Sequence, residues 1–128
     1  MDDLNSVYKK IIEIQQGDSK DKTSVTYSLF KFGRDYMLLI HGGDPHIGSV
    51  GCTDKKTDRQ YHQFTLETHR EDRIVEKAVK TLNRIIKDEV LVVCGIHYDQ
   101  ISLNEIQTIN QNCEELLKQM AEFITNQL

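Results

Sequence analysis

Between two amphipathic segments the chain carries the apolar run Val90-Leu91-Val92-Val93-Cys94. A short run rich in β-branched residues favours a buried strand. In the segment before it, apolar residues recur at helical spacing from Ile74 to Ile86, and in the segment after it from Ile106 to Ile124. Broad apolar stripes of this kind are typical of helices that cover a sheet. The second half is therefore predicted to fold as helix, strand, helix.

Both helices have a start signal in the sequence. Thr68-His69-Arg70-Glu71 and Ser102-Leu103-Asn104-Glu105 have the spacing of a capping box. In such a box the hydroxyl of the first residue accepts from the amide of the fourth, and the carboxylate of the fourth reaches back to the first amide. We therefore expect Glu71 and Glu105 to act as capping carboxylates.

The first half is predicted to contain strands. The expected strands are Ser24–Phe32, Tyr36–Ile40, Ile47–Cys52 and Gln60–Thr68, with a hairpin turn at Gly33-Arg34-Asp35. Residues 4–16 fit either a helix or an opening strand. The expected fold is an α/β (α+β) two-layer sandwich. It has a mostly antiparallel sheet of about five or six strands and two helices on one face, in the order β-β-β-β-α-β-α.

Composition limits the class of protein. A chain of 128 residues and 14.8 kDa allows a single domain, residues 1–128. The formal net charge of −4 argues against nucleic-acid binding, and no apolar run approaches the roughly 20 residues of a membrane span. The start Met1-Asp2-Asp3 does not resemble a signal peptide. Three cysteines without a C-x-x-C pair favour a reducing cytoplasm over a disulfide framework or a cysteine zinc site.

The segment His41-Gly42-Gly43-Asp44-Pro45-His46-Ile47-Gly48-Ser49 is rich in groups that bind ligands. Two adjacent glycines can expose successive backbone amides as a concave anion site, and imidazoles bond either as donors or as acceptors near neutral pH. A phosphate or carboxylate would suit it. The alternative is a tight turn that needs Gly-Gly only for its backbone shape.

Two further segments carry polar groups. In Cys94-Gly95-Ile96-His97-Tyr98-Asp99, His97 and Asp99 follow a buried strand and can point the same way, where ligands of α/β sheets bind. They could equally bond only neighbouring backbone. His69 and Arg70 stand at a helix start that could receive an anion, although charges in a first helical turn are usually just solvated.

A metal site and covalent catalysis are less well supported by the sequence. His41, Asp44, His46, His97 and Asp99 offer nitrogen and oxygen ligands, but their spacing matches no defined geometry, so no metal is expected. The cysteines Cys52, Cys94 and Cys113 are expected in the core, and Ser49 lacks the strand–elbow–helix context of a hydrolase nucleophile. A small metal-dependent enzyme using His41, His46 and His97 stays an alternative.

The order and spacing of the three segments, from about Ser24 to the C-terminus, resemble the prenylated flavin chaperone LpdD-like family, whose members are also described as accessory subunits of gallate or phenolic-acid decarboxylases. The resemblance implies a fold like that of proteasome assembly chaperones, often dimeric. It implies an accessory protein that assists a UbiD-type decarboxylase by binding or delivering prenylated flavin mononucleotide. A dimer is expected through a strand edge or helix face. A purely structural assembly module is the other alternative.

Carried over by position, the resemblance implies a set of cofactor-binding residues and no catalytic or metal-binding ones. These are Gly42, Gly43, Pro45, His46, Gly48, His69, His97 and Asp99. Asp44, Ile47 and Arg70, from the same segments, complete the expected set of cofactor-binding residues. The segment around residue 70 departs most from the family, which often has Gly in place of Thr68 and Lys in place of Arg70.

Overall fold

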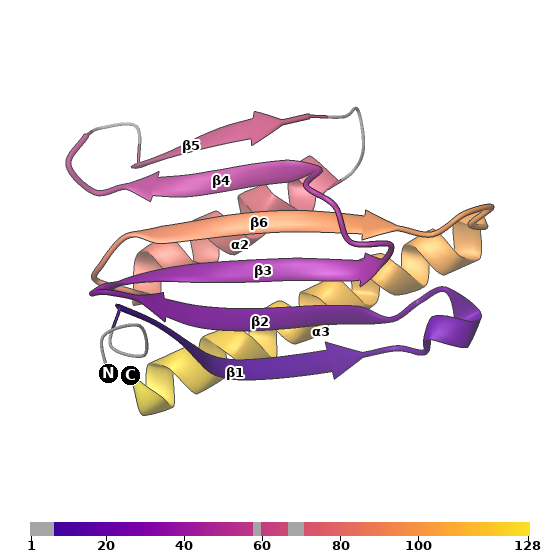
Figure 1. Ribbon diagram of the computed structural model, residues 1–128, viewed down its shortest axis with the longest axis horizontal. Helices are drawn as coiled ribbons and strands as arrows, with labels where there is room; N and C mark the ends of the chain where they lie inside the picture. The colour runs from indigo at the N-terminus through magenta and orange to yellow at the C-terminus, as the bar shows by residue number, and fades with distance from the viewer. Residues whose placement is uncertain (1–6, 58–59, 67–70) are drawn as a thin grey trace.

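The computed structural model describes residues 7–57, 60–66 and 71–128 and has two layers, a six-stranded sheet and a pair of helices (Figure 1). The elements in chain order are β1 (Tyr8–Gln16), a short 3-10 turn η1 (Ser19–Asp21), β2 (Val25–Phe32), β3 (Asp35–Gly43), β4 (Ser49–Asp54), β5 (Gln60–Thr65), α2 (Glu71–Ile85), β6 (Val90–His97) and α3 (Leu103–Gln127). None of the helices among these residues is long and apolar enough to cross a membrane.

The sheet has the strand order β1-β2-β3-β6-β4-β5. Four of its five pairings are antiparallel, and the β3–β6 pair is parallel. The first hairpins are local: Phe32 pairs with Asp35 across the two-residue turn Gly33-Arg34, where Gly33 has a φ of 59°. The last strand of the chain therefore inserts between β3 and β4, near the middle of the sheet.

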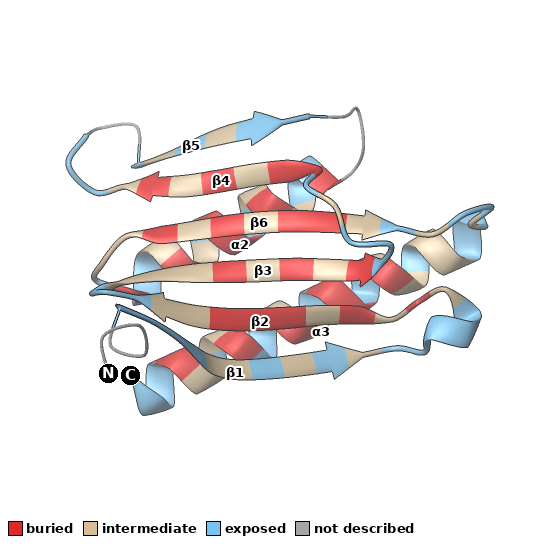
Figure 2. Ribbon diagram, viewed as in Figure 1, coloured by how far each residue is buried: buried red, intermediate tan, exposed pale blue. Residues whose placement is uncertain are grey.

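Both helices pack on the same face of the sheet, and the core lies between the layers (Figures 1 and 2). From the sheet it receives alternate side chains such as Tyr27, Leu38 and Val92, and from the helices Leu82 and Leu116, all less than 2% exposed. Full burial of such a side chain contributes about 2 kcal/mol to folding. This core confirms the predicted two-layer architecture.

The connection from β3 to β4 passes over the end of β6, on the face away from the helices (Figure 1). A Cβ built at Gly95 of β6 would collide with the backbone carbonyl of His46, so only glycine lets the crossover lie this close. Gly43 has a φ of 68°, and a Cβ there would collide with the carbonyl oxygen of His97. Glycines on both strands thus bring the crossover down onto the sheet.

The element bounds correct several predictions. The ambiguous N-terminal segment contains β1, so five strands precede α2 where the predicted order has four. β3 extends to Gly43, so His41, Gly42 and Gly43 belong to a strand and not to a loop. β4 begins at Ser49, and β5 ends at Thr65. Ile85, predicted to lie on the apolar stripe of its helix, is 38% exposed.

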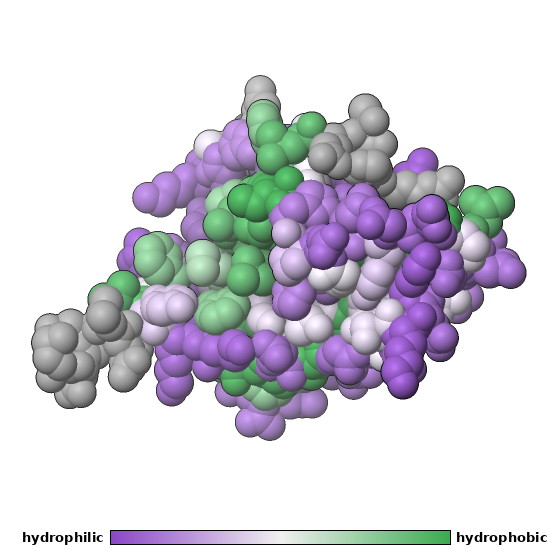
Figure 3. All heavy atoms as spheres, turned by 45° about the vertical axis from the view of Figure 1, so that its right-hand side comes forward, coloured by the Kyte–Doolittle hydropathy of each residue, from purple (hydrophilic) through white to green (hydrophobic). Residues whose placement is uncertain are grey.

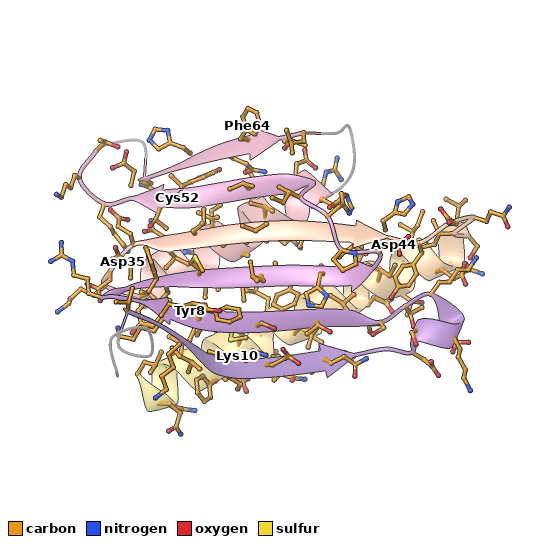
Figure 4. The ribbon with its side chains drawn as sticks, viewed as in Figure 1. Tyr8, Lys10, Asp35, Asp44, Cys52 and Phe64 are labelled. Atoms are coloured by element: carbon orange, nitrogen blue, oxygen red, sulfur yellow. The ribbon has the colours of Figure 1, made fainter. Side chains whose placement is uncertain are left out.

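At the end of the sheet opposite the crossover, the carboxylate of one residue joins neighbouring segments by hydrogen bonds. Glu89, just before β6, accepts from the Thr53 hydroxyl at 2.5 Å and from the Lys55 amide at 3.0 Å. Its own amide donates to Asp35, and the Thr53 oxygen also accepts from the Val90 amide. Each polar group in this network has a partner within the chain. Asp35 and Asp44 mark the two ends of β3 in Figure 4.

Candidate functional site

The candidate site lies where the parallel strands β3 and β6 end side by side. Gly43 of β3 is in register with His97 of β6, and the crossover that follows carries His46 back over β6. The imidazole rings of His46 and His97 meet edge to face, with centroids 6.0 Å apart and planes at 88°. The structure therefore brings together two of the three segments that the sequence singled out, at the carboxyl ends of parallel strands, where α/β sheets bind ligands.

His97 has a carboxylate partner and an exposed ring. Its Nε2 lies 3.0 Å from Oδ1 of Asp99, as expected if both side chains point the same way from an extended chain. The His97 side chain is 49% exposed. In the neutral ring, donation from Nε2–H to Asp99 leaves Nδ1 as an acceptor, and in the protonated ring Nδ1–H is a donor. The ring can thus form a hydrogen bond with a ligand in either protonation state.

Tyr98 fixes the backbone between His97 and Asp99. Its hydroxyl donates to the carbonyl of Ser24 at 2.6 Å, which joins this turn to the segment before β2. Burial of the phenol raises the pKa of Tyr98 above its ordinary value, so the hydroxyl keeps its proton and its donor role at neutral pH. This hydrogen bond holds the turn that presents the His97–Asp99 pair.

His46 is the more constrained of the two imidazoles. Its Nδ1 lies 3.3 Å from the carbonyl oxygen of Asp44, and its Nε2 lies 3.7 Å from Oε1 of Glu71. Its side chain is 28% exposed. Both ring nitrogens therefore face oxygen atoms of the chain, which sets the orientation of the ring beside His97.

Glu71 is a site residue that the sequence analysis placed only in a capping box. It is 5% exposed, and Oε2 accepts from the amide of Ile96 in β6 at 3.2 Å. A Cβ on Gly48 would collide with this carboxylate, so Gly48 leaves the room that Glu71 occupies. Burying a carboxylate costs free energy unless hydrogen bonds compensate it. The crossover and β6 both contact this one buried carboxylate of α2.

A sequence signal for this role of Glu71 exists. Glu71 lies four residues before Val75 and seven before Ala78, on the same helical face as the apolar stripe. A carboxylate on the core face of a helix is buried and needs a partner. The second capping box behaves as predicted, since Ser102 and Glu105 exchange both hydrogen bonds at the start of α3.

The glycine pair does not form the open amide cradle that an anion site needs. Gly42 and Gly43 lie within β3, in register with Ile96 and His97. The amides that flank the crossover, of Asp44 and Gly48, donate to the carbonyls of His97 and Cys94 at 3.0 and 2.9 Å. These two amides are bonded to the sheet. Gly42 and Gly43 lie in a strand, where a Cβ would collide with the carbonyl oxygens of Ser24 and His97, and not in a tight turn.

The remaining candidates divide by location. Pro45 and Ile47 are exposed at the tip of the crossover, Ile47 by 56%, next to the two imidazoles. His41 lies on β3 in register with Thr26 and Gly95. His69 and Arg70 lie outside the described residues. Within residues 7–57, 60–66 and 71–128, no group of three or more His, Cys, Asp or Glu side chains is placed to hold a metal ion.

A concave feature lies on the helical layer. It is a cleft of about 240 Å³ between α2 and α3, and neither His46 nor His97 lines it. Tyr27 and Cys113 form part of its lining, and burial raises the pKa of the Cys113 thiol to about 12, so the thiol is protonated at neutral pH. The cleft therefore offers no thiolate nucleophile.

The architecture places the chain in a known class of small α/β proteins. A crystal structure described as a novel chaperone complex for yeast 20S proteasome assembly matches with a TM-score of 0.58, over 94% of this chain and 97% of that chain, at 10% sequence identity. At this identity the match shows the fold alone. It confirms the predicted likeness to proteasome assembly chaperones in architecture.

The family is narrower than the fold. The family model for the prenylated flavin chaperone LpdD-like domain matches residues 19–125, and the chain belongs to this family. A relative, protein LpdD of Lactiplantibacillus plantarum, is 25% identical over 96 residues, which cover 72% of this chain and 71% of that protein. Membership supports an accessory, chaperone-type role.

Proposed function

We propose that this protein holds prenylated flavin mononucleotide for a UbiD-type decarboxylase, at the end of the sheet where His46 and His97 meet. The observation that carries the proposal is the convergence of these imidazoles, from two segments 51 positions apart by residue number, at the carboxyl ends of parallel strands in an LpdD-like chain. A fixed pair of imidazoles beside an exposed apolar loop suits a ligand with a planar ring and polar edges.

The geometry of each residue gives it a different part in binding the ligand. The exposed His97 ring supplies a hydrogen bond to a polar edge of the ring system, and Asp99 fixes which nitrogen faces the ligand. His46 is held by Asp44 and Glu71 and gives the site a rigid wall. Ile47, exposed beside them, offers apolar surface to the ring. The chain's part is to bind and orient the cofactor.

The site is less suited to binding the phosphate group of the cofactor. Glu71 and Asp99 bring two carboxylates near the two imidazoles, and the amides of Asp44 and Gly48 are bonded within the sheet. The proposal therefore assigns the flavin ring, and not the phosphate, to the site. Riboflavin, which lacks the phosphate, should then bind about as tightly as flavin mononucleotide.

A titration followed by flavin fluorescence tests the proposal with prenylated flavin mononucleotide, flavin mononucleotide and riboflavin. We expect His97→Ala to weaken binding at least tenfold, because it removes the exposed hydrogen-bonding edge. His62→Ala is the matched control. His62 also pairs with a carboxylate, Asp54 at 2.7 Å, but lies at the other end of the sheet. Absence of flavin binding by the wild type would refute the proposal.

A second test concerns the partner. In co-expression, a UbiD-type decarboxylase should gain activity from the wild-type chain and less from His97→Ala, since the chain is proposed to supply its cofactor. A His46→Ala/His97→Ala double variant that folds and activates fully would favour the alternative of a purely structural assembly module. We also propose that the chain acts as a homodimer.

A further inference from the structure

The cleft between α2 and α3 lies on the opposite side of the sheet from the crossover that bears His46. Both helices pack on one face of the sheet, whereas the crossover passes over the other (Figure 1). Figure 3 shows the sheet side of the molecule, where hydrophobic side chains gather between hydrophilic ones. The cleft opens on the helical side, so a ligand in it would leave the site at His46 and His97 free.

The base and walls of the cleft are suited to an apolar group. Tyr27 of β2 and Cys113 of α3 are 1% and 5% exposed, and a hydrogen bond joins their side chains at the base. Burial raises the pKa of both groups, so both keep their protons at neutral pH. Because the hydroxyl and the thiol bond to each other, the base needs no polar group from a ligand. The walls include Ile74 and Leu117, which are half-buried and pack against the core.

The mouth of the cleft is polar and carries one unpaired positive charge. Lys77 of α2 and Glu114 of α3 form an ion pair across it at 2.9 Å, so their charges balance. Arg73 is exposed, and its guanidinium has no hydrogen-bond or ion-pair partner within residues 7–57, 60–66 and 71–128. In the same part of the chain, the side-chain amide of Asn110 has no partner either. The mouth therefore presents hydrogen-bond donors and a net positive charge.

The direction of the two helices places these two unpaired donors at the same level. β5 and β6 are both antiparallel to β4, and α2 and α3 each follow one of these strands and return across the sheet (Figure 1). The helices therefore run the same way. Arg73 precedes Lys77 by four residues, and Asn110 precedes Glu114 by four, which is about one helical turn. Arg73 and Asn110 thus lie on the same side of the ion pair and can bind one anion together.

The size of the cleft limits what it can hold. Its volume is about 240 Å³. An apolar cavity of about 150 Å³ holds one benzene molecule, so this cleft has room for a single ring with a small polar substituent. Pockets for drug-sized ligands begin at about 300 Å³, and the three fused rings of a flavin are too large for this cleft. A ligand here is therefore a different molecule from the cofactor.

We propose that the cleft between α2 and α3 binds a small carboxylate whose apolar body is about the size of one ring. The carboxylate lies between the guanidinium of Arg73 and the amide of Asn110. The apolar body lies beneath the Lys77–Glu114 ion pair, against the walls and base of the cleft. The planar fork of an arginine matches the two oxygens of a carboxylate, which makes this group a better fit than a neutral amide.

The binding site itself does not depend on flavin binding. A decarboxylase acts on carboxylates, so under the proposed function the cleft would hold a molecule of the class that the partner enzyme consumes. Only this link between the cleft and the partner rests on the proposed function.

A titration followed by methyl NMR tests the proposal with benzoate as the probe. The methyl signals of Ile74 and Leu117 should shift with one dissociation constant of about 1 mM or lower, and those of Ile47 at the crossover should not. Benzamide lacks the charge and acetate lacks the ring, so each should bind at least tenfold more weakly. If Ile74 and Leu117 do not shift at about 20 mM benzoate, or if Ile47 shifts more, the proposal is wrong.

Arg73→Gln isolates the recognition of charge. It should raise the dissociation constant for benzoate at least tenfold and leave that for benzamide unchanged, because only the charged ligand uses the guanidinium. Arg73 is exposed, so the variant should fold like the wild type. Arg84→Gln is the matched control, since Arg84 is an exposed arginine of the same helix that does not line the cleft. Equal effects of the two variants would indicate general charge attraction and overturn the assigned site.

The outcomes separate this proposal from that of flavin binding. Benzoate binding in the cleft of a chain with no flavin affinity would support the cleft and refute the proposed function. A chain that binds flavin but not benzoate would overturn the cleft alone. Competition between benzoate and flavin mononucleotide would place benzoate at the His46–His97 site and also overturn the cleft.

Discussion

Each end of the sheet has a carboxylate that accepts a backbone amide and an imidazole that pairs with a second carboxylate. The two ends differ in which side chains these contacts connect. At one end Glu89 bonds to Thr53 and Lys55, and His62 pairs with Asp54 of the neighbouring strand. At the crossover end Glu71 joins Ile96 to His46, and the network continues to the exposed ring of His97.

The comparison separates a structural network from a binding site. A carboxylate that accepts a backbone amide and a His–carboxylate pair are present at both ends, so neither feature alone indicates function. What distinguishes the crossover end is that two imidazoles, His46 and His97, from segments distant in sequence meet edge to face there, beside the loop that carries the exposed Ile47.

The largest effect should come from the crossover itself. Gly95→Ala places a methyl group against the His46 carbonyl, a backbone atom that cannot move alone, and should lower the free energy of unfolding by about 3 kcal/mol. Gly33→Ala is the control, because Gly33 has a positive φ but open space around it, and should cost about 1 kcal/mol. Urea unfolding measures both. Equal costs would contradict a crossover pressed onto β6.

The carboxylates of Glu71 and Glu89, which both accept a backbone amide, should differ more in their effect on flavin binding than in their effect on stability. Glu89→Ala leaves the Thr53 hydroxyl and the Lys55 amide without their acceptor and should cost about 2 kcal/mol of stability, with unchanged flavin binding. Glu71→Ala should cost about 1 to 2 kcal/mol for the Ile96 amide and also weaken flavin binding several-fold, because His46 loses its partner. Unfolding and titration of both variants check this. Equal flavin affinities would remove the distinction between the ends.

The smallest effect concerns the His62–Asp54 pair, toward the end of the sheet opposite the crossover. The hydrogen bond from His62 lowers the pKa of the Asp54 carboxyl below its ordinary 3.8. Because the folded-state pKa is depressed, the stabilisation is complete above the unfolded value and is lost as the pH falls through the lower folded value. Asp54→Asn should therefore lower stability slightly at pH 7, where the pair contributes fully, and should make the loss of stability smaller as the pH falls below about 4. A chemical-shift titration of Asp54 with an ordinary midpoint would contradict the assignment.

Local signals in the sequence predict most of the fold. The Ser102–Glu105 capping box, the Gly33-Arg34 turn and the apolar stripe through Val75, Ala78 and Leu82 each depend on residues close together in the chain, and each is confirmed. The N-terminal segment is ambiguous by sequence alone. The segment forms a strand because residues such as Ile12 and Ile14 pair in register with residues of β2.

The site is predictable only in part. The pairing of His97 with Asp99 follows from two-residue alternation and is confirmed, whereas the meeting of His46 with His97 requires β6 to lie beside β3. The sequence predicts an exposed cradle at Gly42 and Gly43, because composition alone does not show that the strand runs through them. It predicts only a cap at Glu71, since the partner amide on Ile96 is 25 residues further along.

The position of β6 has a consequence for how the molecule forms. β1, β2 and β3 can pair as soon as they are made, and so can β4 and β5, but these two groups meet only through β6, the last strand of the chain. Contacts between distant segments form late, because closing a long loop costs entropy before any contact compensates it. The β3–β4 crossover has no strand beneath it until Gly95 arrives. The site with His46 and His97 therefore assembles among the last parts of the fold, so a chain interrupted before residue 97 cannot hold a ligand there.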